Sequence, residues 1–441
     1  MPGAGLQLEQ APPFSVPLRF FLSAPVFVLL AAIVLVWQGP EALGSRWTPA
    51  ALALTHLLTL GFMAMAMLGA LMQILPVLAG APLPWPRVVA GITHVAILLG
   101  TLALSGGFLW SEPLLLQLAF LLLAGGFAVF VAGAAGALVQ AKLQGAIASE
   151  LWFPVAALAV TVVLGLYLDA ARAWNGLVLA QAWRELHPAW ALAGWTGLLV
   201  AAVAKQVVPM FQMTPSYPSL ASRYFSVAVF ALLVAWSAAQ ALPDSRLAIA
   251  LGLVLSAAYL VFALATLELQ RRRRRRVGDT TLQFWRVGMI SLALAALLWA
   301  SRMAGLAPER FDAALGVLAI VGAAMSLING MLYKIVPFLA WFHLQAIGAG
   351  RRGLSMKSFL AEAPQRRQFA MHLIALVLLL GAACGPVALV YPAAACLGLS
   401  AVLLFSNLMK VVGGYRAMPR PATSEGARTP AHSLAEPRRA Q

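Results

Sequence analysis

The chain has 441 residues, of which 62% are hydrophobic and 10% charged, with a mean hydropathy of +0.88 and a formal net charge of +16. A soluble domain carries about a quarter charged residues, so this composition excludes a water-soluble fold of this size. The apolar runs are about 20 residues or longer, which favours helices over the shorter alternating strands of a barrel. We therefore expect an all-α polytopic protein whose partner is the lipid bilayer.

Residues 1–18 form an N-terminal leader without the basic start and cleavage site of a signal peptide, so we expect the first apolar run to be a mature span. The tail, residues 414–441, has no periodic apolar pattern and should be disordered. Between them we predict a membrane domain, residues 19–413, with about twelve spans. These are 19–38, 50–79, 88–106, 113–139, 150–169, 187–212, 223–242, 246–268, 283–302, 312–342, 368–384 and 391–413.

The positive charge indicates topology, not nucleic-acid binding, because the arginines lie in alternate loops and in the tail. Six consecutive arginines, Arg271 to Arg276, should remain in the cytoplasm, together with both termini. We expect a bacterial inner membrane, with an aromatic belt at the outer side. The loops of that side carry Trp47, Trp110, Trp174 and Trp183.

An internal repeat links the second, sixth and tenth spans. Each has a proline near its end, and a glycine lies fifteen residues before each proline. The spacing of about 130 residues predicts three tandem four-helix units, at about 19–140, 150–269 and 283–413. The units should be related by rotation about the membrane normal, with the second, sixth and tenth spans on the inside. We expect the glycines to allow close approach of a neighbouring helix, and the prolines to end or kink their helices. The residues are Gly61 and Pro76, Gly194 and Pro209, and Gly322 and Pro337.

Three parallel four-helix arcs with functional residues on helices two, six and ten resemble subunit I of the haem–copper oxidases. The segments Arg19 to Phe21, Thr55 to Phe62 and Leu75-Pro76 look closer to the NnrS-type haem- and copper-containing membrane proteins. The architectural resemblance covers roughly residues 19–413. It implies an oxidase subunit I-like fold, b-type haem or copper as cofactor, and partners among respiratory oxidase or reductase components.

By this resemblance, His56 matches the helix-two histidine that ligates low-spin haem, and His187 loosely matches the helix-six copper ligand. The chain also departs from the family pattern. The seventh span has no histidine, and the only histidine of the tenth is His343, near its cytoplasmic end. We therefore expect no binuclear centre and no oxidase or nitric oxide reductase turnover.

The residues themselves suggest a cofactor site at His56. Met63 and Met67 follow at +7 and +11, within about 20° of His56 on an ideal helical wheel. Imidazole and thioether ligands suit Cu(I) or haem iron. The alternative is ordinary membrane packing, with His56 hydrogen-bonded between helices.

His187 shares one face of the sixth span with Gly194 and Lys205, but a plain interfacial histidine is an equal alternative. Relative to their prolines, His56 and His187 point roughly 160° apart on ideal helices, so we expect them to line different spaces. We also expect His94 and His372 to be interfacial.

Two lysines, Lys205 and Lys334, precede the prolines of their spans by four and three residues. They should reach the headgroups by snorkelling, or bind a haem propionate, phosphate or other anion. Cys384 and Cys396 read as buried free thiols, with a facultative disulfide as the alternative.

These observations favour a non-catalytic haem- or copper-binding protein in respiratory metal or nitric oxide homeostasis. One alternative is a transporter for copper or a small solute, with Met63, Met67, Lys205 and Asn329 along its pathway. The other is a factor that assembles an oxidase.

Overall fold

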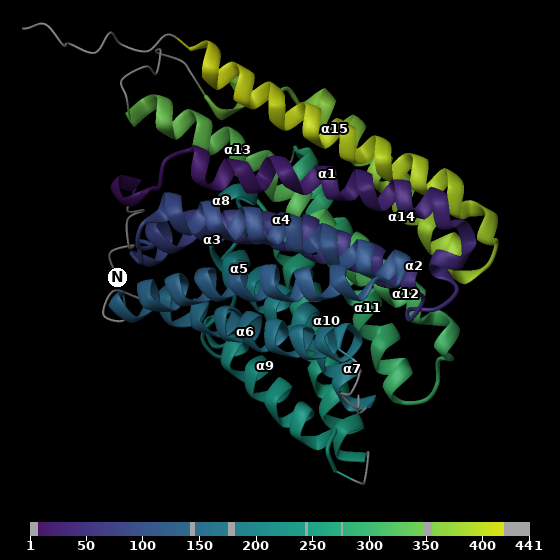
Figure 1. Cartoon of the computed structure of the whole chain (residues 1–441). Helices are drawn as coiled ribbons and strands as arrows, with labels where there is room; N and C mark the ends of the chain where they lie inside the picture. The colour runs from purple at the N-terminus through teal and green to yellow at the C-terminus, as the bar shows by residue number, and fades with distance from the viewer. Residues whose placement is uncertain are drawn as a thin grey trace, which may run out of the picture.

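The computed structural model describes residues 8–141, 146–174, 181–242, 246–274, 277–346 and 355–418. These residues contain no strand, and twelve of their helices are long and apolar enough to cross a membrane (Figure 1). The predicted class, an all-α polytopic membrane protein, is confirmed. The predicted disorder of the tail falls largely outside the described residues, as do the loop arginines Arg275, Arg276, Arg351 and Arg352.

Nine of the twelve spans are single α-helices within the part of the chain that the structure describes. Several extend beyond the predicted ends, because a helix continues through charged positions in the headgroup region. The first span, for example, begins at Ser15, inside the predicted leader. The nine helices are α1 (Ser15–Gln38), α4 (Pro86–Trp110), α5 (Pro113–Gln140), α6 (Ala146–Ala173), α9 (Ser219–Ala239), α10 (Arg246–Arg271), α11 (Thr280–Met303), α14 (Glu362–Cys384) and α15 (Val390–Ala417).

The second, sixth and tenth spans instead contain a π-helical segment between two α-helices. A π-helix is rare and occurs often at functional sites. The second span is α2 (Pro49–His56), η3 (Leu57–Ala64) and α3 (Met65–Ala79). The sixth is α7 (Gln181–Ala189), η4 (Trp190–Gly197) and α8 (Leu198–Gln212). The tenth is α12 (Asp312–Gly316), η6 (Val317–Met325) and α13 (Ser326–Ala346).

The three π-segments have the same position relative to the repeated prolines. They begin 19, 19 and 20 residues before Pro76, Pro209 and Pro337, and each ends 12 residues before its proline. The prolines lie inside α3, α8 and α13, so none of them ends its helix. The sequence repeat therefore coincides with a repeated distortion of the backbone.

The repeated glycines lie within these π-segments and allow close approach of the preceding first helix. A methyl group at Gly61 would overlap Phe27 of α1. At Gly322 it would lie 2.7 Å from the Ser291 Cβ of α11, and at Gly194 it would lie 3.2 Å from the Ala157 Cβ of α6. The predicted role of these glycines is confirmed.

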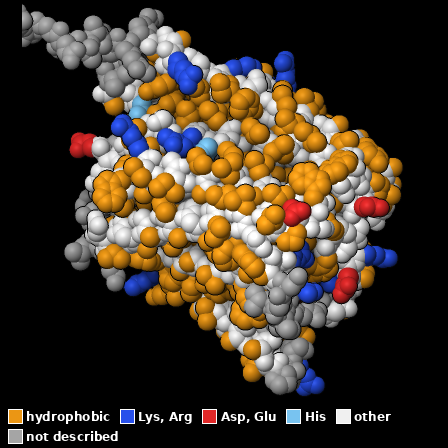
Figure 2. Space-filling model, viewed as in Figure 1, with side chains coloured by type: hydrophobic (Ala, Val, Ile, Leu, Met, Phe, Trp, Pro, Cys, Tyr) orange, Lys and Arg blue, Asp and Glu red, His pale blue; other side chains and the backbone are white. Residues whose placement is uncertain are grey.

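The helices form a closed bundle. The first and last spans, α1 and α15, pack side by side, as do α5 with α6 and α10 with α11 (Figure 1). Apolar side chains dominate the visible surface, where a bilayer would solvate them (Figure 2). Below, the histidine end means the end of the bundle at which α2, α7 and α12 begin. Short 3₁₀ segments are η1 (Leu8–Gln10), η2 (Gly39–Leu43), η5 (Glu309–Phe311), η7 (Met356–Ser358) and η8 (Val387–Leu389).

Candidate functional site: a histidine pair between the second and sixth spans

His56 and His187 face each other at the histidine end. Their ring centres are 6.3 Å apart, and the ring planes differ by 19°. The expectation that they line different spaces is wrong. Two helices that lie side by side in a bundle face each other through opposite flanks, so a wide angle relative to the prolines brings these side chains to one interface.

The backbone sets the same tautomer in both rings. The Nδ1 of His56 lies 2.8 Å from the Leu52 carbonyl oxygen, and the Nδ1 of His187 lies 3.1 Å from the Thr161 carbonyl oxygen of α6. A carbonyl only accepts, so in each neutral ring Nδ1 donates its hydrogen and Nε2 retains its lone pair. Within the described residues neither Nε2 takes part in a hydrogen bond. Histidines that bind metals show this arrangement.

A glycine of α6 leaves room for the second ring. A methyl group at Gly165 would lie 2.8 Å from the Cε1 of His187. On the other side, the Phe108 ring centre is 5.4 Å from that of His56, and the Arg172 guanidinium lies 5.3 Å from the Phe108 ring centre. Both histidines are half-buried. The pair is thus packed on two sides and partly accessible.

A buried carboxylate lies further along the same face of α6. Asp169 follows Thr161 and Gly165 in steps of four, the spacing that places side chains on one helix face. It is 7% exposed, and neither carboxylate oxygen has a hydrogen-bond partner among the described residues. Sequence reasoning missed Asp169, although an acidic residue within a span is itself a functional signal.

Ion pairs connect the inner spans at the histidine end. Arg46, just before α2, pairs with Glu185 of α7, two residues from His187. The Nε of Arg46 also lies 3.2 Å from the carboxylate of Asp312 in α12. That carboxylate forms a second ion pair with Arg302, whose Nε lies 2.8 Å away. A network of this kind stabilises more than isolated surface pairs do. The four residues lie far apart in the sequence, in loops and at the ends of predicted spans, so the sequence did not suggest the network.

The methionines proposed beside His56 do not accompany it. A turn of π-helix takes an extra residue, so the ideal helical wheel fails across η3. At about 1.5 Å per residue, Met67, eleven residues after His56, is roughly 16 Å further along the span. Met63 and Met67 are both buried, and Met67 lines a separate cavity between the inner spans. No group of three or more histidine, cysteine or acidic side chains in the described residues is placed to share a metal.

The two lysines are paired inside the bundle. The Lys205 Nζ lies 2.9 Å from Glu150 and also donates to the Ser222 carbonyl oxygen. The Lys334 Nζ lies 2.7 Å from Asp279, which also caps α11. Each carboxylate lies at the start of the preceding first helix, so neither snorkelling nor anion binding describes these lysines.

The remaining candidates are largely structural. His372 is fully buried and His94 is half-buried; that they lie at the membrane interface stays a prediction. Asn329 is buried on α13, and its Oδ1 has no partner among the described residues. Cys384 is exposed and Cys396 half-buried; both are free thiols, so the expectation of buried cysteines fails for Cys384.

No protein-family model matches the chain, and no curated protein matches it in sequence. The function is therefore inferred from the site.

Proposed function

We propose that this membrane protein binds one redox-active metal cofactor, copper or b-type haem, between His56 and His187. The observation that carries the proposal is the pair itself. Each imidazole is held through Nδ1 by a backbone carbonyl, and the two rings lie 6.3 Å apart with Nε2 free of hydrogen bonds in the described residues. The residues fit a metal that takes two imidazole nitrogens.

The ring separation fits two imidazoles that share one metal ion. With metal–nitrogen bonds of about 2.0–2.1 Å, two imidazoles on one ion have ring centres roughly 5–6 Å apart. The observed distance of 6.3 Å between the ring centres of His56 and His187 is close to this range. Imidazole is a good ligand for copper and for haem iron.

Copper is the better-supported cofactor, because it needs only the two imidazoles present. The buried Asp169 carboxylate, on the face of α6 that carries Thr161 and Gly165, would stabilise a bound cation. Haem is the second candidate. Arg172, beside Phe108 and close to His56, is a cation available to a propionate.

We place the protein outside catalysis, in respiratory metal or nitric oxide homeostasis of a bacterial inner membrane, with both termini cytoplasmic. The seventh span carries no histidine, and both nitrogens of His343 face backbone carbonyls, of Leu339 and Pro12. Neither the seventh span nor His343 therefore supplies ligands for a second metal site. Delivery of cofactor to an oxidase or reductase is compatible with the same pair.

The test is to purify the full chain from cells supplied with copper and haem precursor, and to measure metal content, pyridine haemochrome and reduced visible spectra. We expect one copper or one haem per chain, lost in His56→Ala and retained in His94→Ala, whose ring bonds Ser23 instead. Full cofactor content in His56→Ala would refute the site. A colourless, metal-free protein that carries a solute into proteoliposomes would favour the transporter instead.

A further inference from the structure

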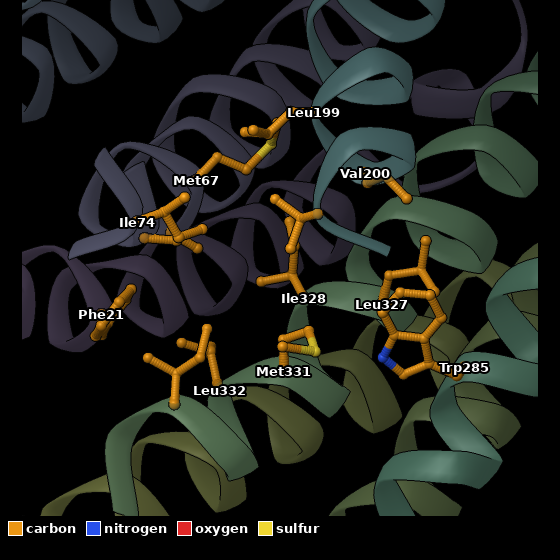
Figure 3. A pocket seen from close by; sticks show the side chains of 14 residues that line it. Phe21, Met67, Ile74, Leu199, Val200, Trp285, Leu327, Ile328, Met331 and Leu332 are labelled. Carbon is orange, nitrogen blue, oxygen red and sulfur yellow. The ribbon is translucent and has the colours of Figure 1, made fainter. Parts of the chain in front are cut away.

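A second site lies between the three inner spans. α3, α8 and α13 line a cavity whose water-accessible volume is about 80 Å³ and whose side chains are all apolar or aromatic (Figure 3). Equivalent positions of the three helices contribute to it. Nine residues before the repeated prolines are Met67, Val200 and Ile328, and six residues before them are Ala70, Val203 and Met331.

One polar group faces this cavity. Trp285 of α11 is 2% exposed, and its Nε1–H has no hydrogen-bond acceptor among the described residues. The close-up shows the indole nitrogen turned toward the interior of the cavity, on the side of Met331 (Figure 3). A buried donor without an acceptor is unfavourable, and tryptophan N–H groups usually find a partner. A ligand with one acceptor would satisfy it.

The lining also limits the ligand's charge and size. No charged side chain lines the cavity, so a bound ion would be uncompensated. Lys205 and Lys334, on the same helices, are engaged by Glu150 and Asp279. The volume open to a water-sized molecule is about 80 Å³, which is room for several water-sized groups, as a small flat ring requires.

Two methionines in the cavity wall favour a ligand with a flat ring. Met67 and Met331 project from different helices, α3 and α13, toward the same space (Figure 3). Thioether sulfurs contact flat unsaturated rings favourably and adapt to their shape. We propose that the cavity binds an uncharged, membrane-soluble carbonyl compound of the quinone class, with a ring oxygen accepting from the Trp285 Nε1–H. This site is separate from the histidine pair and does not depend on the metal.

The test uses the full chain in nanodiscs of quinone-free lipid, with a decyl-substituted benzoquinone as probe and bound probe measured at equilibrium. We expect one probe per chain. Trp285→Phe keeps an aromatic side chain, though a smaller one, and removes the N–H, so it should weaken binding about tenfold. Ala70→Phe fills the cavity and should abolish binding. Ala132→Phe, the same change at an exposed position of α5, should leave binding unchanged.

Two results would overturn the proposal. The first is equal affinity in wild type, Trp285→Phe and Ala70→Phe. The second is displacement of the probe by a monoacylglycerol that binds more tightly than the quinone, since that would make the occupant a lipid ester. Thermal midpoints of all variants establish that each is folded; if Ala70→Phe is unfolded, the Trp285→Phe affinity decides.

Discussion

Four of the five histidines in the described spans form two contrasting pairs. In His94 and His372, the Nε2 atom lies 2.8 Å from a serine hydroxyl, that of Ser23 or Ser326. The Ser23 hydroxyl donates its hydrogen to the Arg19 carbonyl oxygen. The Nε2–H of His94 therefore donates to the Ser23 oxygen. In His56 and His187, Nδ1 donates to a backbone carbonyl oxygen, and Nε2 has no hydrogen-bond partner among the described residues. All four rings thus use one nitrogen in a hydrogen bond; what separates the candidate ligands is that His56 and His187 face each other, whereas His94 and His372 each pack against a phenylalanine.

The two packing histidines also occupy matching places. His94 contacts Phe20 of α1 and His372 contacts Phe284 of α11, with ring centres 5.1 and 5.5 Å apart. His56 and His187 instead meet each other across the boundary between the predicted first and second units. The tenth span has the π-segment but no histidine at its start. The candidate metal site therefore departs from the repeat, whereas the packing histidines follow it.

The largest expected effect is loss of the metal on removal of one ligand. In His187→Ala, copper or haem content should fall below about a tenth of wild type, because one imidazole does not retain the metal. Metal analysis of the purified protein checks this, with His372→Ala as the control for loss of a histidine. Equal metal loss in both variants would break the contrast between the pairs.

A smaller effect is expected when the ring is displaced instead of removed. Gly165→Ala places a methyl group 2.8 Å from the Cε1 of His187 and should weaken Cu(I) binding about tenfold. Competition with a chromophoric Cu(I) chelator gives the affinity. Gly136→Ala is the matched control, since an added methyl there meets no atom within 4 Å. An unchanged affinity in Gly165→Ala would mean that His187 is not a ligand.

The buried carboxylate should contribute less. Asp169→Asn keeps the shape and removes the charge, so it should weaken Cu(I) binding about threefold through lost attraction. The same chelator competition measures it, and uptake of haem by the same variant should be nearly unaffected. A tighter Cu(I) affinity would show that the carboxylate has no role in the site.

The smallest effect on metal binding is expected at a packing histidine. His372→Ala should keep full metal content but lower the free energy of unfolding by about 2 kcal/mol, because it leaves a cavity and removes the partner of Ser326. Thermal unfolding in detergent measures the loss. A variant as stable as wild type would show that His372 contributes nothing to packing.

The sequence by itself determined the membrane class, the twelve spans and the repeated Gly–Pro pattern, because these depend on local composition and spacing. It also singled out His56 and His187. It missed the π-segments, since no residue type demands them. It therefore also grouped His56 with Met63 and Met67 on an ideal helical wheel that does not apply across a π-segment. It also missed the carboxylate partners of Lys205 and Lys334, which come from the preceding helix.

Tertiary structure alone decided which of these side chains meet. The packing of α6 and α7 near α2 decides that His56 and His187 face each other and that the Thr161 carbonyl orients one ring. It also buries Asp169, whose carboxylate oxygens have no hydrogen-bond partner among the described residues. The same holds for the indole of Trp285 in its apolar cavity. Contacts between spans that are distant in sequence leave no periodic pattern in the sequence of either span. Each helix pairs its own backbone N–H and C=O groups, and lipid can solvate any apolar helix face, so neither requirement specifies the neighbouring helix.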